Sequence, residues 1–214
     1  MRYLIVCGGK IDKEFGLNEI KTDGIDAIIA ADSGMDFLYE NGVTPDIIVG
    51  DFDSTTTNAL EYFERKGQTE IRRLNPIKDD TDTEYAIRLA ISEGARSIVL
   101  LGATGSRIDH VLGNISLLGI GLESGTDISI IDTNNRIRMA DKPVTIEKSA
   151  QYGRFVSLIA LTDDNEGSLK GFKYPVTDYS FDRFTSLGIS NEIVDDHALI
   201  DIHRGKFIII ESKD

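Results

Sequence analysis

Aspartates directly follow apolar runs in the first part of the sequence. Asp51 and Asp53 lie in the segment GDFDST after the run IIVG, and Asp32 follows the run IIAA. Ligands of open parallel sheets bind beyond the carboxyl ends of the strands, so we expect these residues at one sheet edge. Two carboxylates at a strand end can reach one cation, and Mg²⁺ prefers hard oxygen ligands. The pattern favours a magnesium site at Asp51 and Asp53, and the alternative is a polar turn with an aspartate cap.

The segment KDDTDTE, residues 78–84, places more carboxylates after the next expected strand. Thr81 and Glu84 have the spacing of a capping box, so we expect a helix to begin here. Asp82 then projects from the first helical turn, where capping and chemical roles can coexist. Lys78 is a candidate for neutralising phosphate charge, and the alternative is a solvated loop lysine.

The segment GATGSRIDH, residues 102–110, combines small residues with an expected strand-to-helix turn. Backbone N–H groups at such a turn favour an anion. Arg107 is a candidate for bidentate contact with phosphate, and the alternative is that Arg107 and Asp109 stabilise the turn. The segment lacks the Gly-Lys-Ser/Thr ending of a phosphate loop, and GGKI at residues 8–11 fails the same template. A Walker-type mechanism is therefore excluded.

These residues require a sheet whose strand ends converge. Up to Asp132, apolar runs alternate with amphipathic stretches, which predicts βα repetition and a mostly parallel, doubly wound sheet. Apolar runs without alternation are typical of central parallel strands covered on both faces, and they occur at residues 4–7, 27–31, 47–49 and 98–101. Helices are expected at residues 34–41, 58–66, 82–93 and 110 to about 122.

After Asp132 the pattern changes to short alternating strands without a helical period. We therefore expect two domains, an α/β domain at residues 1–132 and a small all-β sandwich or barrel at residues 133–214. The best strands of the second are RFVSLIALT, ALIDIH and KFIIIES, and Arg204 with Gly205 lies where a tight hairpin would join the last two. No Pro-rich or Ser-rich linker separates the domains, so we expect them to pack closely and share functional surface.

Composition limits the partners. The 214 residues carry a net charge of −13, which repels nucleic acid and anionic lipid. No apolar run approaches the roughly 20 residues that cross a bilayer, so neither nucleic acid nor a membrane is an expected partner. The single Cys7 and the lack of a signal-peptide pattern favour a reducing cytoplasm. An anionic substrate would need bridging cations or a local basic patch.

With these residues assembled, the chain resembles the thiamine pyrophosphokinase family in its bacterial form. The resemblance rests on ADSG, GDFDS, KDDTDTE, GATGSRIDHVLGN and SLGISNE, in that order, and spans most of the chain. It implies an α/β domain followed by a β domain. It also implies transfer of a pyrophosphoryl group from ATP to the hydroxyethyl oxygen of thiamine, giving thiamine diphosphate and AMP. A homodimer whose site draws on both subunits is implied as well.

The resemblance assigns roles to both domains. Asp51, Asp53 and Asp82 match the acids that hold Mg²⁺ and the ATP phosphates, and Asp109 matches a further active-site carboxylate. The residues expected to contact ATP are Asp32, Lys78, Thr81 and Arg107. In the second, thiamine-binding domain, Ser190 and Asn191 match residues that receive thiamine.

Three questions stay open at the level of sequence. Asp82 and Asp109 are both candidates for accepting the alcohol proton. Some family members stack an aromatic ring near thiamine, but this chain has no Trp, so Tyr174 and Phe184 are the alternatives. The histidines are poor candidates for a metal site and are assigned no chemistry: His110, His197 and His203.

Two rival functions are compatible with part of the sequence. In the first, DFDST is an aspartyl-phosphate hydrolase motif in which Asp51 attacks phosphate and Asp53 acts as acid and base. That motif normally follows the first strand, whereas here it follows the third, and GATGSRIDH and SLGISNE are left without purpose. The second rival is a non-catalytic nucleotide or metal sensor, which would bind ligand without forming AMP.

Overall fold

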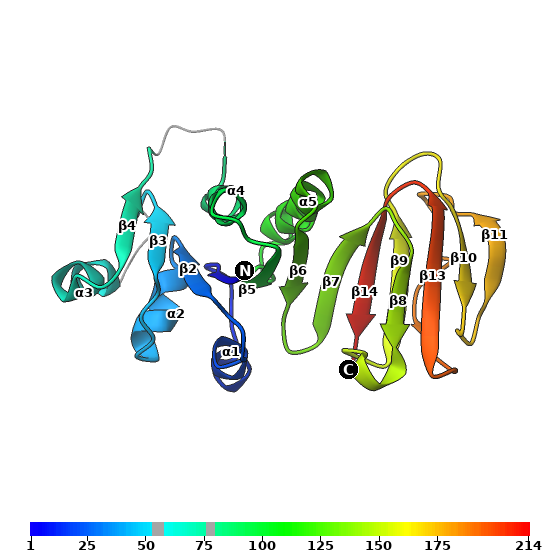
Figure 1. Cartoon of the computed structure of the whole chain (residues 1–214), viewed down its shortest axis with the longest axis horizontal. Coiled ribbons are helices and arrows are strands. Elements are labelled where there is room, and N and C mark those ends of the chain that lie inside the picture. The colour runs from blue at the N-terminus through cyan, green and yellow to red at the C-terminus, as the bar shows by residue number, and fades with distance from the viewer. Residues whose placement is uncertain (53–57, 76–79) are drawn as a thin grey trace. The chain divides into compact units, whose positions relative to one another are not determined.

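The computed structural model in Figure 1 describes residues 1–52, 58–75 and 80–214. Contacts divide the chain into two compact units, Met1–Thr133 and Asn134–Asp214. The first unit alternates strands with helices, and the second is built from antiparallel strands. The predicted fold class, an α/β part followed by a small β sandwich, is confirmed.

The first unit has a parallel sheet with the strand order β6-β5-β1-β2-β3-β4. Its strands are β1 (Arg2–Val6), β2 (Ala27–Ala31), β3 (Ile47–Gly50), β4 (Glu70–Arg73), β5 (Ser97–Leu101) and β6 (Asp127–Ile131). The chain adds strands on one side of β1 up to β4 and then crosses to the other side. The switch point therefore lies between the carboxyl ends of β1 and β5, where open α/β sheets bind ligands.

Helices cover both faces of this sheet (Figure 1). One face carries α1 (Lys13–Ile20), α2 (Gly34–Glu40) and α3 (Ala59–Lys66), and the other carries α4 (Asp82–Ser92) and α5 (Ile108–Ser124). Right-handed crossovers explain this division, because the chain reverses its direction across the sheet after β4. Leu4, Met35 and Phe63 are buried in the core beneath α2 and α3.

The helix α1 was not predicted from the sequence. Gly16 interrupts its pattern and lowers helix propensity by about 1 kcal/mol relative to Ala. The Asp12 carboxylate caps the helix by accepting a hydrogen bond of 2.9 Å from the N–H of Phe15. A Cβ at position 16 would lie 2.6 Å from Ile11 Cγ2 and 2.7 Å from Phe37 Cζ, so a larger residue would push these two side chains away and glycine favours the close approach of α1 to α2.

The second unit is a sandwich of two antiparallel sheets, with strand orders β12-β9-β14-β7 and β11-β10-β13-β8. Buried residues of both sheets, such as Val156, Ile200 and Phe207, form its core. A short 3-10 helix, η1 (Lys148–Ala150), follows β8. The strands are β7 (Asn135–Ala140), β8 (Val144–Glu147), β9 (Phe155–Ala160), β10 (Glu166–Lys170), β11 (Val176–Ser180), β12 (Asn191–Glu192), β13 (His197–Arg204) and β14 (Phe207–Ser212).

The predicted hairpin between the last two strands is wrong. β13 pairs with β10 and β8, whereas β14 pairs with β7 and β9. Arg204 and Gly205 therefore connect the two sheets of the sandwich. Gly205 has φ +89°, and a Cβ there would lie 2.3 Å from Asn165 Oδ1. The glycine does mark a tight turn, but the residues of a turn do not reveal whether the strands beside it pair.

A buried carboxylate lies in the sheet that contains β14. Glu211 is 0 % exposed and lies opposite Arg136 of β7. It accepts hydrogen bonds of 2.9 and 2.7 Å from Arg136, 2.8 Å from Arg138 and 2.9 Å from the N–H of Tyr152. A buried charge is tolerated when it is paired and hydrogen-bonded in this way.

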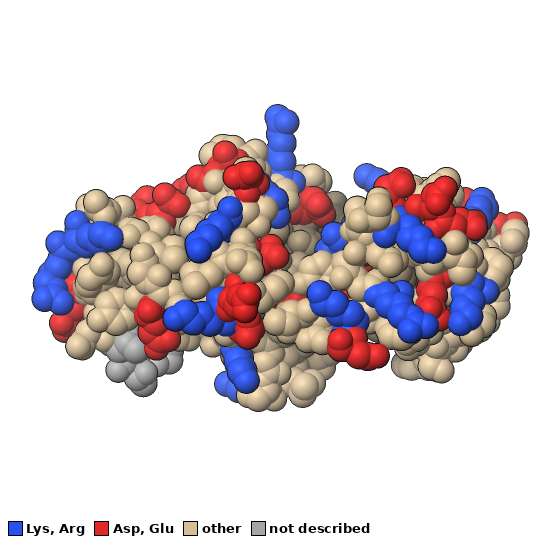
Figure 2. Space-filling model, turned by 90° about the horizontal axis from the view of Figure 1, so that it is seen from below, with Lys and Arg blue, Asp and Glu red and all other residues tan. Residues whose placement is uncertain are grey.

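Charged side chains of both signs are exposed. Figure 2 shows Lys and Arg interspersed with Asp and Glu on the face that it presents. The net charge of −13 is thus not gathered into one acidic patch on that face. Within the described ranges, no helix combines the length and the apolar character that crossing a membrane requires.

Candidate active site

Three of the predicted acids meet at the carboxyl edge of the first sheet. Asp32 follows β2, Asp51 follows β3, and Asp82 is the first residue of α4. One carboxylate oxygen from each lies within 4.8 Å of the others, and all three residues are partly exposed. Carboxylates this close repel one another unless a cation or proton compensates the charge. We call this group the acid cluster. Of the other predicted residues here, Asp53 and Lys78 lie outside the described residues.

The backbone is strained at one residue of the acid cluster and at one residue beside it. Asp32 has φ +48° and Phe52, which follows Asp51, has φ +63°. The N–H of Asp32 donates a hydrogen bond of 2.8 Å to the carbonyl of Val49, which joins the end of β2 to β3. Left-handed φ values in residues other than glycine are uncommon and gather at functional sites, where the surrounding structure maintains them.

The start of α4 fixes the third acid. Thr81 is the N-cap, and its Oγ1 accepts a hydrogen bond of 3.2 Å from the N–H of Glu84. The Glu84 carboxylate accepts from Arg88, at 2.7 and 2.9 Å, one turn further along the helix. The cap satisfies one N–H group of the first turn and holds Asp82 at the positive end of the helix dipole.

A cavity of about 450 Å³ lies at the switch point of the sheet. Two contacts show that the cavity adjoins the acid cluster. Thr83, which follows Asp82, lines the cavity. Gly8 also lines it and is in close contact with Ser33, the neighbour of Asp32, because a Cβ at Gly8 would lie 2.1 Å from Ser33 Oγ. The lining comes from the loops after β1 and β5, from the first turn of α4 and from the first two turns of α5: residues 7–10, Thr83, residues 102–107, His110, Val111 and Asn114.

The two loops of this cavity are held at close range. The N–H of Gly9 donates a hydrogen bond of 2.9 Å to the carbonyl of Gly102. A Cβ at position 9 would lie 2.3 Å from that oxygen and 2.4 Å from the carbonyl oxygen of Thr104. Asn114 Nδ2 donates a hydrogen bond of 2.8 Å to the carbonyl of Ala103. Glycine at position 9 thus permits a contact between backbones that fixes the shape of the cavity.

Arg107 and Asp109 form an ion pair. The guanidinium donates to the carboxylate at 2.6 and 3.2 Å, and both side chains are largely exposed. The hydrogen bond from Arg107 lowers the pKa of Asp109 to about 2. Arg107 lines the first cavity, while Asp109 lines a second one of about 340 Å³ with Thr81 and His110. The pairing is the one expected if these neighbours stabilise the turn.

Ser190 and Asn191 lie beside a separate pocket within the second unit. Ser190 has φ +58°, and its N–H donates a hydrogen bond of 2.9 Å to Ser157 Oγ. Asn191 is buried; its Oδ1 accepts from the N–H of Tyr174 at 3.0 Å, and its Nδ2 donates to the carbonyl of Tyr174 at 2.9 Å. The pocket, of about 290 Å³, is lined by Asn191, Tyr174, Leu169, Val176 and residues 186–189.

Comparisons with known proteins match both parts of the chain. The model of the thiamin pyrophosphokinase catalytic domain matches residues 21–130, and that of the vitamin B1 binding domain matches residues 143–207. The thiamine pyrophosphokinase of Bacillus subtilis is 34% identical over 188 residues, which cover 87% of each chain. The chain belongs to the thiamine pyrophosphokinase family. The resemblance read from the sequence segments is thereby confirmed.

Solved structures agree with this thiamine pyrophosphokinase assignment. The crystal structure of thiamine pyrophosphokinase from Bacillus subtilis superimposes with a TM-score of 0.89 at 32% identity and covers 100% of both chains. That of thiamin pyrophosphokinase from Geobacillus thermodenitrificans gives a TM-score of 0.86 at 29% identity, covering 100% of this chain and 98% of the other. The similarity therefore extends over both units.

Several residues of this candidate site were missed from the sequence. Thr83, His110 and Asn114 line the cavities, whereas the sequence alone predicts no chemistry for His110. His110 and Asn114 are four residues apart, so the helical period places them on one face of α5. That spacing, combined with the glycine-rich turn before the helix, was the signal available in the sequence.

Proposed function

We propose that this chain is a thiamine pyrophosphokinase whose phosphate-transfer site is the acid cluster. The enzyme transfers the pyrophosphoryl group of ATP to the hydroxyethyl oxygen of thiamine, giving thiamine diphosphate and AMP. The observation that carries the proposal is the convergence of three carboxylates, with oxygens within 4.8 Å of one another, beside a cavity at the switch point of the sheet. Phosphoryl transfer depends on positioning the reactants and on stabilising charge. The cavity can position the nucleotide, and a cation held by the carboxylates can stabilise the charge of its phosphates.

The donor atoms of the acid cluster fit Mg²⁺. They are hard carboxylate oxygens, they come from three different elements, and they remain partly exposed, so phosphate oxygens and water can complete an octahedron. Asp51, Asp53 and Asp82 would hold the ion, with Asp32 beside them. When bound, Mg²⁺ supplies compensation for the charge of the ATP phosphates.

The cavity between the loops after β1 and β5 receives the nucleotide. Backbone N–H groups at the start of α5 favour phosphate, and Arg107 is the nearby guanidinium. Arg107 is paired with Asp109 at 2.6 Å, so binding a phosphate would replace the Asp109 carboxylate with the phosphate as the partner of the guanidinium. Lys78 and Thr81 are the further candidates for contact with ATP.

Asp82 is the better candidate for accepting the proton of the thiamine hydroxyl. Efficient general bases have a pKa near the working pH. The hydrogen bond from Arg107 lowers the pKa of Asp109 to about 2, so that carboxylate is a weak base at neutral pH for as long as Arg107 stays paired with it rather than with a phosphate. Asp82 belongs to the acid cluster, where the transferred phosphates would be held, so its position suits the role if Asp51 and Asp53 alone bind Mg²⁺.

Thiamine binds at the pocket beside Ser190, with Tyr174 as the aromatic ring. Two hydrogen bonds between the Asn191 amide and the Tyr174 backbone hold Tyr174 at the pocket, and Tyr174 is 61% exposed. An aromatic face attracts a cation such as the thiazolium ring. Phe184 is 94% exposed and is not among the described lining residues, so we do not assign it the stacking role.

The first experiment measures AMP and thiamine diphosphate after incubation of the purified protein with ATP, Mg²⁺ and thiamine. Equal amounts of both products, formed only when all three are present and no chelator is added, support the proposal. Asp51→Asn abolishes turnover with little effect on folding, while Asp127→Asn, an exposed aspartate at the start of β6, is the matched control. Free phosphate without thiamine diphosphate, or binding without turnover, would contradict the proposal.

A homodimer whose sites combine residues of two subunits can be tested by mixing inactive variants. Asp51→Asn and Ser190→Ala are unfolded together, refolded and assayed at low thiamine. If each site takes Asp51 from one subunit and Ser190 from the other, hybrids regain one intact site, and about a quarter of wild-type activity returns. If each site lies within one subunit, the mixture stays inactive.

A further inference from the structure

A second group of potential metal ligands lies on the sheet β11-β10-β13-β8 of the second unit. His203 of β13, Glu166 of β10 and Asp178 of β11 each offer one ligand atom within 4.8 Å of the others. The ring nitrogen Nδ1 of His203 lies 3.6 Å from Glu166 Oε1 and 3.6 Å from Asp178 Oδ1. Glu166 and His203 are partly exposed, and Asp178 is exposed, so an ion can reach all three from solvent.

A β-bulge in β13 places the imidazole beside Glu166. Glu166 lies opposite Arg204, but its neighbour Gly167 lies opposite Ile202, so His203 is the extra residue at the register shift. A bulge re-aims the side chain of the extra residue relative to a regular ladder. The His203 side chain therefore lies beside Glu166, the first residue of β10, on the solvent face of the sheet, while Ile202 is buried in the core.

A second irregularity, in β11, brings the other carboxylate to the same place. Gly167 lies opposite Tyr179, whereas Leu169 lies opposite Val176, so β11 has an extra residue in this stretch. Asp178 lies there. Its N–H donates a hydrogen bond of 2.9 Å to Ser168 Oγ, and Ser168 Oγ lies 3.2 Å from Asp178 Oδ1. The central strand β10 thus fixes both the backbone and the carboxylate of Asp178.

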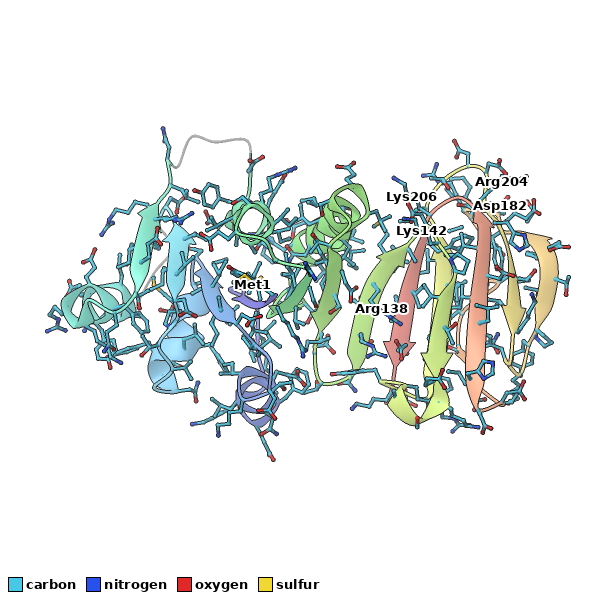
Figure 3. The ribbon with its side chains drawn as sticks, in the orientation of Figure 1. Met1, Arg138, Lys142, Asp182, Arg204 and Lys206 are labelled. Atoms are coloured by element: carbon cyan, nitrogen blue, oxygen red, sulfur yellow. The ribbon has the colours of Figure 1, made fainter. Side chains whose placement is uncertain are left out.

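The remaining atoms of the ligands have partners of their own. Arg204, at the carboxyl end of β13 (Figure 3), pairs with Glu166 Oε2 and leaves Oε1 facing His203. On the other side of the ring, Asp201 Oδ2 lies 3.7 Å from His203 Nε2 and 3.1 Å from Lys170 Nζ. Carboxylates that interact with the second nitrogen of a histidine ligand orient the ring and increase its basicity.

Two of the three spacings are close to those around a tetrahedral ion. Ligand atoms about 2.0–2.1 Å from Zn²⁺ are separated by about 3.3 Å in a tetrahedron, so the two observed distances of 3.6 Å need only a small closure. The donor set is one imidazole nitrogen and two carboxylate oxygens. This mixed set suits transition metals, whereas Mg²⁺ is bound through oxygen.

We propose that His203, Glu166 and Asp178 bind a divalent transition-metal ion, with Zn²⁺ as the preferred ion. Three protein ligands leave one position for water or another ligand. The ion would link three neighbouring strands at the solvent face of the sandwich. The site shares no residue with the acid cluster and is independent of the proposed function. Without metal, the same residues form ion pairs when His203 is protonated, and this is the competing explanation that the experiment must exclude.

The experiment is a titration of the metal-free, full-length protein with Co²⁺, a spectroscopic substitute for Zn²⁺, in excess Mg²⁺ that occupies oxygen-only sites. We expect a visible absorption band that saturates at about one equivalent and disappears on addition of Zn²⁺. His203→Gln should remove the band, while His197→Gln, an exposed histidine on the same strand, should keep it. Zn²⁺ should also raise the Tm of the wild type but not that of His203→Gln.

A second variant keeps the test decisive if His203→Gln folds poorly. The side chain of Asp178 is 68% exposed, so Asp178→Asn removes a ligand without disturbing the core. We expect at least tenfold weaker Co²⁺ binding by this variant, as for comparable changes around metal sites. Absence of the band in the wild type, or a band unchanged in both variants, would overturn the proposal.

Discussion

Replacing Gly9 with Ala tests whether the two loops at the switch point position the nucleotide. The added Cβ would lie 2.3 Å from the carbonyl oxygen of Gly102 and 2.4 Å from that of Thr104. Close carbon–oxygen contacts in proteins begin at about 3.3 Å, so the loops would have to separate by about 1 Å. Both clashing atoms belong to the backbone, and side-chain rotation cannot relieve them.

A displacement of this size has two expected effects. Misplacing substrate-positioning groups by about 1 Å lowers activity by about 100-fold, so kcat/KM for ATP should fall by that factor. Overpacking should also lower the free energy of unfolding by about 1–3 kcal/mol. The hydrogen bond from Gly9 to Gly102 and that from Asn114 to Ala103 resist the separation, which is why we expect a clear effect.

The measurements are steady-state AMP formation at varied ATP and unfolding by urea. Gly105→Ala is the matched control, because it adds the same methyl group to the same cavity but at 3.9 Å from Gly9, an ordinary contact distance. We expect this control to lose far less activity than Gly9→Ala. Wild-type kcat/KM in Gly9→Ala would refute the idea that close approach of these loops shapes the nucleotide site.

Three further predictions follow from individual contacts. Arg107→Ala should raise the pKa of Asp109 from about 2 towards its ordinary value of about 3.9, as measured by carboxyl NMR titration. Since the folded pKa is the lower one, the wild-type pair stabilises the fold above about pH 4 and loses this effect as the pH falls through about 2, and the variant should lack that dependence. Burial raises the pKa of Cys7 to about 11, so a thiol reagent at pH 8 should label it only after unfolding. Glu211→Ala leaves two arginines without their shared carboxylate and should lower the free energy of unfolding by about 3 kcal/mol in urea, the lower end of the usual range because both arginines keep access to solvent.

The first unit could be predicted well because its signals are local. Apolar runs without alternation mark strands covered on both faces, as at Ile29, which is fully buried. Glycines after helices mark their ends, and Gly42 and Gly67 do have positive φ, +68° and +64°. The helix α1 escaped prediction because Gly16 serves a tertiary contact, which local propensity does not represent.

The second unit shows the limit of this approach. Alternation along β13 correctly indicates which residues face the core, such as Ile200 and Ile202. It does not identify the strand that pairs with β13, because alternation specifies a face and not a neighbour. Interpreting Arg204 and Gly205 as a hairpin turn was wrong for that reason. The bulge at His203 was hidden as well, since it depends on the register with β10.

The acid cluster could be anticipated because it follows from topology. Parallel strands end at one edge of the sheet, so aspartates after β2 and β3 must be neighbours there. The cavity could not be anticipated, because it depends on the contact of Gly9 with Gly102 across the switch point. The choice between Asp82 and Asp109 as base required the ion pair of Arg107, which the sequence offered only as an alternative.

Backbone strain gives an independent reason to place function at the proposed sites. In the part of the chain that the structure describes, the non-glycine residues with positive φ are Asp32, Phe52, Asp178 and Ser190. Aspartate tolerates this conformation, but at phenylalanine and serine it costs about 1 kcal/mol or more, so packing must maintain it. Asp32 belongs to the acid cluster, Phe52 follows its member Asp51, and Ser190 is the residue proposed to receive thiamine. Residues that adopt a backbone conformation unfavourable for their type are expected where function imposes a geometry. Positive φ at residues other than glycine therefore points to candidate sites even in a structure without a bound ligand.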